Sequence, residues 1–307
     1  MPPRRVLVTG SRGFVGRHLI ARLRADLPDT DLVEAVFDVA DATAVEDAVR
    51  AFRPDACVHL AAVAAIAAAR QDPGRAWRVN LHGTLVLARA LMAHAPGASL
   101  LFASSADAYG ASFRAGRALD EGAPLAPQNT YAATKAAADL ALGALAAEGG
   151  LRVLRLRPFN HTGPGQSSAY VVAAFAEQVA RIAAGHQPPV LHVGALDPVR
   201  DFLDVRDVCA AYVACLRRAA DLPPGSVLNL ASGVPRRVGD VLDALLHLAG
   251  VEASVQTDAA RLRPSDIPAA TGDAGLARRV LDWAPAIAWE QTLRDVLADW
   301  QGRIGRA

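Results

Sequence analysis

Lysine and cysteine are both scarce in this sequence of 307 residues. Lys135 is the single lysine among 32 lysine and arginine residues, so any chemistry that needs a compact ammonium group depends on that position. The three cysteines, Cys57, Cys209 and Cys215, show neither a CxxC pair nor a Cys/His ligand spacing, which excludes a disulfide scaffold and a zinc site. We expect all three in the core of a cytoplasmic protein without a metal.

The sequence also lacks an excess of either charge and a long apolar run. Its 32 basic and 31 acidic side chains give a net charge of +1 without a basic cluster, so nucleic acid is not an expected partner. The longest weakly polar stretch, 56–69, has about 14 residues, whereas a membrane-spanning helix needs about 20, so no membrane association is expected. A hydrophobic content of 52% is instead enough for a packed core in about two domains.

Short apolar runs alternate with helical stretches through the first half of the chain. The expected strands are Val6–Val8, Leu32–Phe37, Ala56–Leu60, Ser99–Ala103 and Val153–Leu156, and the expected helices are Phe14–Ala25, Ala42–Phe52, Ala76–Ala93 and Tyr131–Ala147. Such an alternation requires right-handed crossovers and a parallel sheet. The predicted fold class is therefore α/β, with a doubly wound parallel sheet over residues 1–158.

Prolines punctuate the sequence after Pro158, around the expected helices Ala169–Ala184 and Asp204–Arg218. Loops of this kind above a sheet commonly grip a substrate. We therefore expect residues 159–307 to form a smaller C-terminal substrate-binding lobe. This lobe is expected to be discontinuous, with part of it returning to the sheet.

Three glycines stand at three-residue spacing directly after the first expected strand. Gly10, Gly13 and Gly16 would let the chain turn tightly and bring a pyrophosphate onto the free N–H groups of the next helix, which begins at Phe14 and Val15. The alternative is an ordinary tight turn between a strand and a helix. Because both elements flank the glycines in the required order, we favour a dinucleotide site.

Charged residues near this turn bear on the choice of cofactor. Asp38, next to Val39, follows the second expected strand, where it could accept a hydrogen bond from the adenine amino group or be a solvated strand end. Asp41 could equally be a helix N-cap. Arg12 precedes the second glycine, where it could face a 2′-phosphate and favour NADPH, or be an ordinary surface arginine. The expected cofactor is NADP(H) or NAD(H).

Tyr131 precedes Lys135 by four residues in a helical stretch, so the phenol and the ammonium group share one helix face. A phenol with an ordinary pKa of about 10 is a poor acid or base at pH 7. An ammonium group about 4 Å away would supply about 4 kcal/mol toward lowering that pKa. We therefore predict an acid–base pair in which Lys135 lowers the pKa of Tyr131. The alternative is a tyrosine and a lysine on a solvent-facing helix surface.

Two further polar residues stand at the ends of expected elements. Ser105 follows the strand 99–103 at the carboxyl end of the sheet, where its hydroxyl could donate to a substrate carbonyl oxygen or simply form a turn. Asn80 precedes Gly83 and Thr84, where it could organise the active site or cap a helix. The sequence leaves both alternatives open at these positions.

Taken together, these motifs resemble the extended short-chain dehydrogenase/reductase superfamily of nucleotide-sugar epimerases, dehydratases and reductases. The resemblance rests on the TGxxGxxG turn at 9–16, His59-Leu60-Ala61-Ala62 after a strand, Asn80 with Gly83-Thr84, Ser105 ahead of Tyr109-Gly110, and Tyr131 with Lys135. It implies a Rossmann domain that binds NAD(H) or NADP(H), partly through Leu60, Ala61, Ala62 and Asn80. It also implies that Tyr131 is the acid/base, that Lys135 binds the nicotinamide ribose, and that Ser105 holds the substrate oxygen.

The second half of the chain resembles the members of that superfamily that reduce GDP-4-keto-6-deoxy-D-mannose. The segments concerned are 157–166, 193–207 and 262–266. The resemblance implies that the region of Asn160 and Arg200 contacts the diphosphate of a GDP-linked 4-keto-6-deoxyhexose. It implies further that Arg263 and Asp266 hold the nucleoside.

Arg200 and Asp107 also have alternative interpretations. Arg200 could form an ion pair with Asp201 or Asp204 instead of contacting phosphate. Dehydratases of the superfamily carry Glu just before the Tyr-Gly pair, whereas this chain has Ala106 and Asp107 there. Asp107 is therefore expected to contact the substrate of a reductase. A GDP-mannose 4,6-dehydratase or a 4-epimerase is the alternative enzyme.

Two expectations concern the whole molecule. The alternative from a different class is a nonenzymatic dinucleotide sensor on the same fold, which would not need the set of Ser105, Tyr131 and Lys135. The alanine-rich stretches 76–93 and 131–147 could pack against a second subunit or cover the sheet, and we expect a homodimer.

Overall fold

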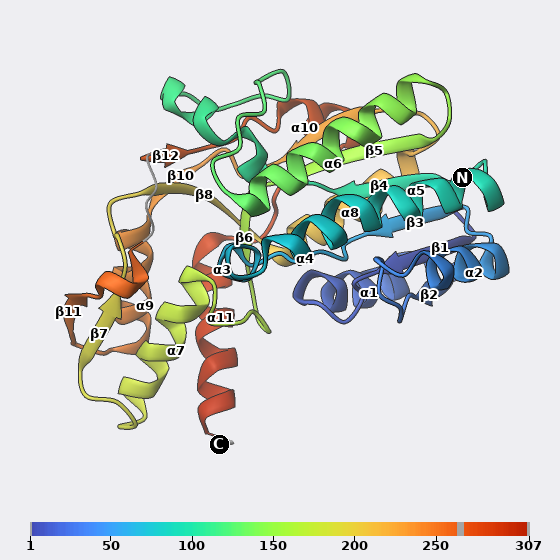
Figure 1. The fold of residues 1–307 in the computed structure, drawn as a ribbon. Helices are drawn as coiled ribbons and strands as arrows, with labels where there is room; N and C mark the ends of the chain where they lie inside the picture. Colours follow the sequence, from blue (N-terminus) through green and yellow to red (C-terminus); the bar gives the residue numbers. More distant parts are fainter. Residues whose placement is uncertain (1, 263–266, 306–307) are drawn as a thin grey trace.

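A parallel sheet of six strands forms the centre of the larger lobe in the computed structural model, which describes residues 2–262 and 267–305 (Figure 1). Across the sheet the strands are β2 (Asp31–Glu34), β1 (Arg5–Thr9), β3 (Ala56–His59), β4 (Ser99–Ala103), β5 (Arg152–Pro158) and β9 (Ser226–Leu230). All neighbouring pairs are parallel. The chain reverses its direction of travel between β1 and β3, the place where doubly wound sheets bind ligands at the carboxyl ends of the strands. The predicted fold class is confirmed.

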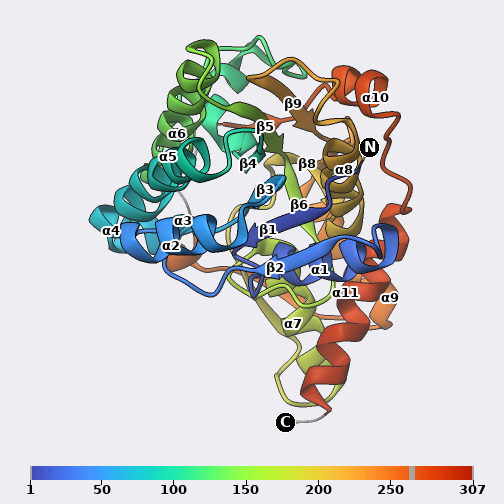
Figure 2. The same cartoon turned by 90° about the vertical axis from the view of Figure 1, so that its right-hand side faces the viewer.

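Helices cover both faces of this sheet because successive side chains of a strand point to opposite faces. Val6 and Val8 of β1 share a core with helices of one face, and Leu7 shares a core with helices of the other. The first set is α1 (Phe14–Asp26), α8 (Val205–Arg218) and α10 (Gly275–Leu281), and the second is α2 (Ala42–Phe52), α5 (Thr84–His94) and α6 (Thr130–Ala147). Figure 2 shows the two helical layers on either side of the sheet.

The crossover between β3 and β4 differs from the prediction of one helix over 76–93. It contains α3 (Ile66–Gln71), α4 (Pro73–Trp77), the π-helical segment η1 (Arg78–Gly83) and then α5. A π-helical turn holds an extra residue and changes the direction of the side chains that follow. Here it brings Gly83 so close to Val39 that a Cβ on the glycine would lie 2.9 Å from the Val39 carbonyl oxygen.

Strand β2 is also shorter than predicted, since it ends at Glu34 and not at Phe37. Its last paired residue, Glu34, lies opposite Val8, one residue before β1 itself ends. The Ala35 nitrogen still donates to the Val8 carbonyl oxygen at 2.8 Å, and β1 then ends at Thr9, before the glycine-rich turn. The sequence pattern could not show this limit, because it is set by the neighbouring strand.

The smaller lobe has a core of its own, built from elements of the second half of the chain (Figure 1). One sheet contains β6 (Asn160–Thr162), β8 (Val199–Asp204), β10 (Pro235–Arg237) and β12 (Ala269–Ala270), and a second pairs β7 (Val190–Val193) with β11 (Ser254–Thr257). The helices are α7 (Val171–Ala183), α9 (Val238–Ala249), the short η3 (Ala259–Arg261) and α11 (Trp289–Ile304). Within the described ranges, no helix is both long and apolar enough to cross a membrane.

Candidate active site

The glycine-rich turn joins β1 to α1 and packs directly on the end of β3. Gly10 has a φ of +70°, and a Cβ there would lie 2.7 Å from the backbone nitrogen of Ala61. A Cβ on Gly16 would lie 2.2 Å from the carbonyl oxygen of Gly10. Gly13, the N-cap of α1, has no side chain that could bond the first N–H groups of the helix. The turn therefore presents the positive end of α1 at the carboxyl edge of the sheet, as a pyrophosphate site requires.

Ser11 adds an unpaired polar atom to this turn. Its side chain is buried, and its hydroxyl has no hydrogen-bond partner among the residues that the structure describes. Buried hydroxyl groups normally have a partner. A phosphate oxygen beside the turn would satisfy both this hydroxyl and the free N–H groups of α1, so the residues present fit a dinucleotide cofactor.

His59 links three elements beneath the turn. Its Nδ1 lies 2.7 Å from Thr9 Oγ1, and its Nε2 lies 2.9 Å from Thr84 Oγ1. Because Thr84 donates its proton to the Asn80 carbonyl oxygen, it accepts from Nε2, and Thr9 donates to Nδ1. Burial and, to a smaller extent, Lys135 lower the pKa of His59 to about 3. The ring is therefore neutral at pH 7, and its two hydrogen bonds hold the end of β3 in place.

Asn80 holds the loop after β3 against α6. Its Oδ1 accepts from the Val63 backbone nitrogen at 2.8 Å, and its Nδ2 donates to Thr134 Oγ1 at 2.9 Å. Because Asn80 lies inside η1, it does not cap a helix. The segment 60–62 forms the start of the loop that Asn80 holds, directly beyond the glycine-rich turn. Contacts of these residues with the cofactor stay predictions.

The acidic residues after β2 have mainly local partners. Asp41 accepts from the Ala44 backbone nitrogen at 3.1 Å, so its interpretation as the N-cap of α2 is confirmed. Asp38 is exposed and accepts from the Ala40 nitrogen at 3.0 Å, and its neighbour Val39 is buried. The contact of Asp38 with adenine stays a prediction.

Glu34 is the carboxylate that ends β2, and the sequence analysis missed it. It lies about 18 residues after Gly16, where dinucleotide sites often place an acid. That spacing was the available signal, but it was obscured because the strand was expected to continue to Phe37. The side chain of Glu34 forms an ion pair with Arg24 of α1, with Nη2 and Oε1 2.9 Å apart.

Tyr131 and Ser105 meet at the carboxyl end of β4. Tyr131 lies in the first turn of α6, whose N-cap Asn129 accepts from the Ala132 nitrogen at 2.9 Å. Ser105 is the N-cap of the 3₁₀-helical segment η2 (Ala106–Ala115), and its Oγ accepts from the Asp107 nitrogen at 3.1 Å. The Ser105 side chain also lies near enough to the Tyr131 phenol to lower its pKa. The predicted pair of hydroxyl groups is therefore assembled.

Lys135 lies one turn further along α6 and is buried. Its Nζ donates to the Ala103 carbonyl oxygen at 2.5 Å and lies 4.7 Å from the centre of the Phe102 ring. Burial lowers the pKa of Lys135 to about 8, against an opposing effect of Asp139. The ammonium form therefore predominates at pH 7, with one of its three N–H groups engaged by β4.

The electrostatics of Tyr131 differ from the prediction. Lys135 was expected to lower its pKa, but the pKa of Tyr131 is raised in this structure. Burial is the largest cause and the negative charge of Asp107 adds to it, whereas Ser105 acts in the opposite direction. The ammonium group does not offset these effects, since it is held against Ala103. Tyr131 is consequently a protonated phenol at neutral pH.

Asp139 extends the helix face of Tyr131 and Lys135 by one more turn. Its carboxylate is fully buried and accepts two hydrogen bonds from Arg157, at 3.0 and 2.8 Å, and one from Arg155, at 3.1 Å. Burial alone would raise the pKa of Asp139, but the bonds and charge of Arg157 hold it below its ordinary value. The sequence analysis did not select this acid, although its spacing of four residues from Lys135 was visible.

Arg200 has neither of the two ion-pair partners proposed for it as an alternative. Asp204 instead pairs with Arg206, with Nη2 and Oδ2 2.7 Å apart. Asp201 accepts from the Ser232 hydroxyl at 2.6 Å. Within the described ranges, both acids are therefore committed to other groups.

The guanidinium of Arg200 is anchored by backbone oxygens near the start of β8. It donates to the Val199 carbonyl at 2.7 Å and to the Ile267 carbonyl at 3.2 Å. Burial lowers the pKa of Arg200, and the negative charge of Asp107 opposes that effect. Asn160 is exposed on β6, the strand that pairs with β8. Both Tyr131 and Arg200 therefore lie in the field of Asp107.

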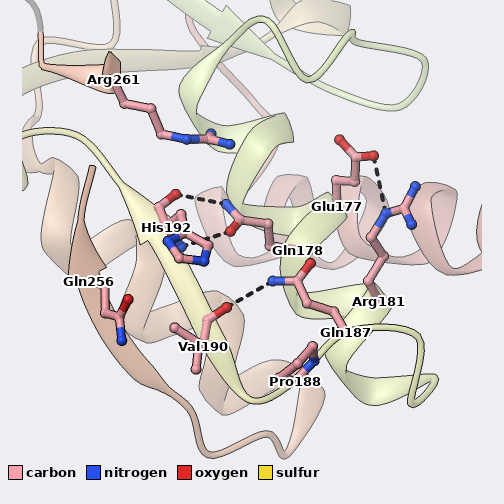
Figure 3. Close-up of a pocket in the computed structure, with 9 residues that line it drawn as sticks. All are labelled: Glu177, Gln178, Arg181, Gln187, Pro188, Val190, His192, Gln256 and Arg261. Atoms are coloured by element: carbon pink, nitrogen blue, oxygen red, sulfur yellow. Dashed lines mark hydrogen bonds and ion pairs between the residues drawn. The ribbon is translucent and has the colours of Figure 1, made fainter. Parts of the chain in front are cut away.

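A hollow of about 480 Å³ lies in the smaller lobe between α7, β7 and β11 (Figure 3). Its lining residues are Glu177, Gln178, Arg181, Gln187, Pro188, Val190, His192, Gln256 and Arg261. Gln178 bonds both backbone groups of His192, at 2.8 and 3.1 Å. The predicted nucleoside-binding residues Arg263 and Asp266 lie outside the described residues, shortly after Arg261.

Comparison with known proteins identifies the relatives of this chain. The model of the NAD dependent epimerase/dehydratase family matches residues 6–231. A GDP-6-deoxy-D-mannose reductase of Pseudomonas aeruginosa is 36% identical over 302 residues, which are 98% of each chain. A GDP-6-deoxy-D-talose 4-dehydrogenase of Aggregatibacter actinomycetemcomitans is 26% identical and covers 88% of each.

Similar solved structures support the same family assignment as the sequence relatives. The structure of RMD from Pseudomonas aeruginosa complexed with NADPH superposes with a TM-score of 0.90 at 36% identity, covering 98% of this chain and 99% of that one. A UDP-glucose 4-epimerase of Thermus thermophilus in complex with NAD has a TM-score of 0.84 at 30% identity, covering 97% and 99%. The predicted family is thereby confirmed: the chain belongs to the NAD dependent epimerase/dehydratase family.

Proposed function

We propose that this protein is an NAD(P)H-dependent reductase of GDP-4-keto-6-deoxy-D-mannose. Its product would be GDP-D-rhamnose or the C4 epimer GDP-6-deoxy-D-talose. The relative that is 36% identical over nearly the whole chain is a GDP-6-deoxy-D-mannose reductase, and a second relative acts on GDP-6-deoxy-D-talose. Reductase and dehydrogenase name opposite directions of the same hydride transfer at a sugar carbon.

The observation that carries this proposal is the position of Ser105 beside a protonated Tyr131 at the carboxyl end of β4. Reduction of a ketone produces an alkoxide that must receive a proton. A phenol whose pKa is raised by burial and by Asp107 is protonated at pH 7 and can supply it. Ser105, on the adjacent segment, is placed to donate a hydrogen bond to the same oxygen.

The bound cofactor would supply a hydride to C4 of the sugar. Tyr131 Oη then donates its proton to the C4 oxygen while Ser105 Oγ stabilises the negative charge that develops there. Lys135 keeps two N–H groups beyond the one bonded to Ala103, and these would bind the nicotinamide ribose.

A GDP-mannose 4,6-dehydratase or a 4-epimerase is the alternative activity. Elimination of water across C5 and C6 needs a further acid and base beside Ser105. Ala106 carries no ionisable group, and Asp107 is the only acid next to it. The site thus has the groups that a reductase needs, whereas those for a dehydratase are incomplete.

Two incubations separate these activities. The purified protein is given GDP-mannose alone, or GDP-4-keto-6-deoxy-D-mannose with NADPH, and absorbance at 340 nm and the sugar products are followed. We expect cofactor oxidation with the keto sugar and no conversion of GDP-mannose. Conversion of GDP-mannose to its 4-keto-6-deoxy product would reject the reductase assignment. NMR of the reduced sugar then determines the configuration at C4.

The two lobes divide the substrates in this proposal. Residues 1–158, together with β9, would hold the dinucleotide, and the rest of the second half would hold the GDP-sugar. Asn160 and Arg200 would contact the diphosphate, and Asp107 would contact the sugar. The hollow beside Arg261 offers amide and guanidinium donors (Figure 3). In the sequence, Arg263 and Asp266, which are predicted to hold the nucleoside, follow Arg261.

We also infer a cytoplasmic homodimer. The three cysteines are free and buried, which suits a reducing compartment. On α6, Leu140 is 60% exposed between small alanine side chains, so this helix offers a surface on which a second copy could pack. Neither nucleic acid nor a membrane is included among the proposed partners. Sedimentation or light scattering would determine the oligomeric state.

A further inference from the structure

The end of β2 is where a dinucleotide site of this fold distinguishes NAD from NADP. A carboxylate there accepts hydrogen bonds from the 2′-hydroxyl of NAD and repels the 2′-phosphate of NADP. Glu34 occupies this end. It lies opposite Val8, and Val8 precedes Gly10 of the glycine-rich turn by two residues. Taken alone, Glu34 would therefore select NAD.

Glu34 is not alone, because Arg24 of α1 binds it with Nη2 and Oε1 2.9 Å apart. The Arg24 side chain is 68% exposed and that of Glu34 is 35% exposed. An ion pair this exposed adds little to stability, typically less than about 1 kcal/mol. Its main effect is electrostatic, since the charge of Arg24 offsets the negative charge of Glu34.

A second hollow, of about 390 Å³, opens beside this ion pair. Its lining includes the side chains of Ser11, Arg12, Arg17, Arg24 and Glu34. Three guanidinium groups and one carboxylate leave a formal charge of +2. A phosphate monoester carries about −1.5 to −2 at pH 7, so the two charges match.

The residues that line the hollow also include an unpaired hydroxyl group and an arginine that is bonded to backbone oxygens. Ser11 is 2% exposed, and its hydroxyl has no hydrogen-bond partner in the described part of the chain. Arg17 donates only to backbone oxygens there, to Arg12 at 2.9 Å and to Gly165 at 3.3 Å. Such a set of a buried hydroxyl and arginines is suited to bind an oxyanion.

We propose that Arg12 and Arg24 form the binding site for the 2′-phosphate of NADP(H), with Arg24 neutralising Glu34 so that the acidic strand end accepts it. The protein then binds NADPH more tightly than NADH. This proposal rests on the dinucleotide site of the proposed function but not on the identity of the sugar. It decides a cofactor choice that the sequence leaves open.

Binding of each cofactor to the full chain without sugar tests the proposal. Dissociation constants are measured by the nicotinamide fluorescence of NADPH and NADH at low salt. We expect NADPH to bind at least tenfold more tightly, with a ratio that falls as salt rises. Equal affinity for the two cofactors would overturn the proposal. Adenosine 2′,5′-bisphosphate should displace NADPH at lower concentration than 5′-AMP or inorganic phosphate. Equal displacement by inorganic phosphate would indicate a general anion site and would reject the proposal.

Variants separate the roles of the individual residues. Arg12→Gln should weaken NADPH binding and leave NADH binding within twofold, whereas Ser11→Ala should weaken the binding of both cofactors. Arg24→Gln should weaken NADPH binding about tenfold, because it exposes the carboxylate of Glu34 to the phosphate. Adding Glu34→Gln to Arg24→Gln should restore most of the loss, whereas a purely structural role of Arg24 predicts no restoration.

Arg22→Gln is the matched control for Arg24→Gln. Arg22 lies on the same helix and also pairs with an acid, Asp26, at 2.6 Å, but it does not line the hollow. Its substitution should change neither dissociation constant. Unchanged NADPH affinity in Arg24→Gln would reject this proposal. It would not affect the proposed reductase function, which is tested by the separate incubations with the two sugars. A protein that prefers NADPH but does not reduce the keto sugar would reject only the proposed function.

Discussion

The Ser105 side chain lies beside the Tyr131 phenol and lowers its pKa, so the end of β4 and the first turn of α6 meet at these two residues. Each residue is held by its own local cap, so the pair does not depend on a flexible loop. Asp107 contributes to both sides of this arrangement, since its backbone nitrogen bonds Ser105 and its charge raises the pKa of Tyr131. The pair is built to keep a proton on the phenol until the substrate oxygen becomes basic.

Removal of the phenolic hydroxyl tests this assignment. Tyr131→Phe should lower kcat by about 10²- to 10⁴-fold, the usual contribution of a general acid, while the dissociation constant of NADPH changes little. The measurement is NADPH oxidation with the 4-keto sugar, together with cofactor binding by fluorescence. A variant that binds NADPH normally and keeps full activity would support the alternative of a nonenzymatic sensor and reject the acid role.

The pH dependence of kcat/KM should show the titration of Lys135. Burial lowers its pKa to about 8, so its charge is lost as the pH rises through that value, while Tyr131, with a raised pKa, is still protonated. We expect kcat/KM to fall above about pH 8. Lys135→Arg keeps a charge to much higher pH, so any activity it retains should show no such fall. The same alkaline limb in that variant would assign the titration to another group.

The same shift makes a prediction about stability. Between pH 8 and pH 10 the unfolded chain keeps the Lys135 proton and the folded chain releases it, so the free energy of unfolding rises with pH. At pH 7 the buried charge costs about 3 kcal/mol on this basis. Lys135→Met should therefore be more stable than the wild type at pH 7, with a difference that narrows toward pH 10. Urea denaturation at both pH values measures it, and a constant difference would contradict the cause given.

Local patterns were sufficient to predict the glycine-rich turn and the helix face shared by Tyr131 and Lys135. A strand, three glycines and a helix are contiguous in sequence, and a spacing of four residues has the same meaning in every helix. These features require no knowledge of distant contacts. The ends of the parallel strands then bring Ser105 to the same edge of the sheet.

Properties that depend on distant parts of the chain were predicted less well. The direction of the Tyr131 pKa shift was wrong because burial and Asp107 outweigh the ammonium group, which β4 holds against Ala103. Strand β2 was drawn too long because β1 sets its end, and this hid Glu34. The π-helical turn around Asn80 likewise depends on contacts with the loop after β3 and with α6. None of these effects has a local signature.

The buried carboxylate of Asp139 should be important for stability. It lies between Arg157 and Arg155, and removal of its charge would leave two guanidinium groups without compensation in or near the core. Asp139→Asn should lower the free energy of unfolding by about 3–5 kcal/mol. Asp26→Asn, which breaks the surface pair with Arg22, is the control and should cost less than about 1 kcal/mol. Similar costs for both variants would show that burial does not set the difference.

The closeness of the glycine-rich turn to β3 can be measured with a matched pair of glycines. Gly10 and Gly116 have nearly equal φ values, +70° and +68°, so alanine meets the same left-handed backbone strain at both positions, about 1–2 kcal/mol. Around Gly116 a Cβ would have open space, whereas at Gly10 it would lie 2.7 Å from the Ala61 nitrogen. Gly10→Ala must therefore also push the turn away from β3.

We expect Gly116→Ala to show only the backbone cost in urea denaturation and to bind NADPH normally. Gly10→Ala should be less stable than Gly116→Ala and should lose at least tenfold in NADPH affinity. Equal behaviour of the two variants would mean that the close approach of the turn to Ala61 is not needed for the dinucleotide site.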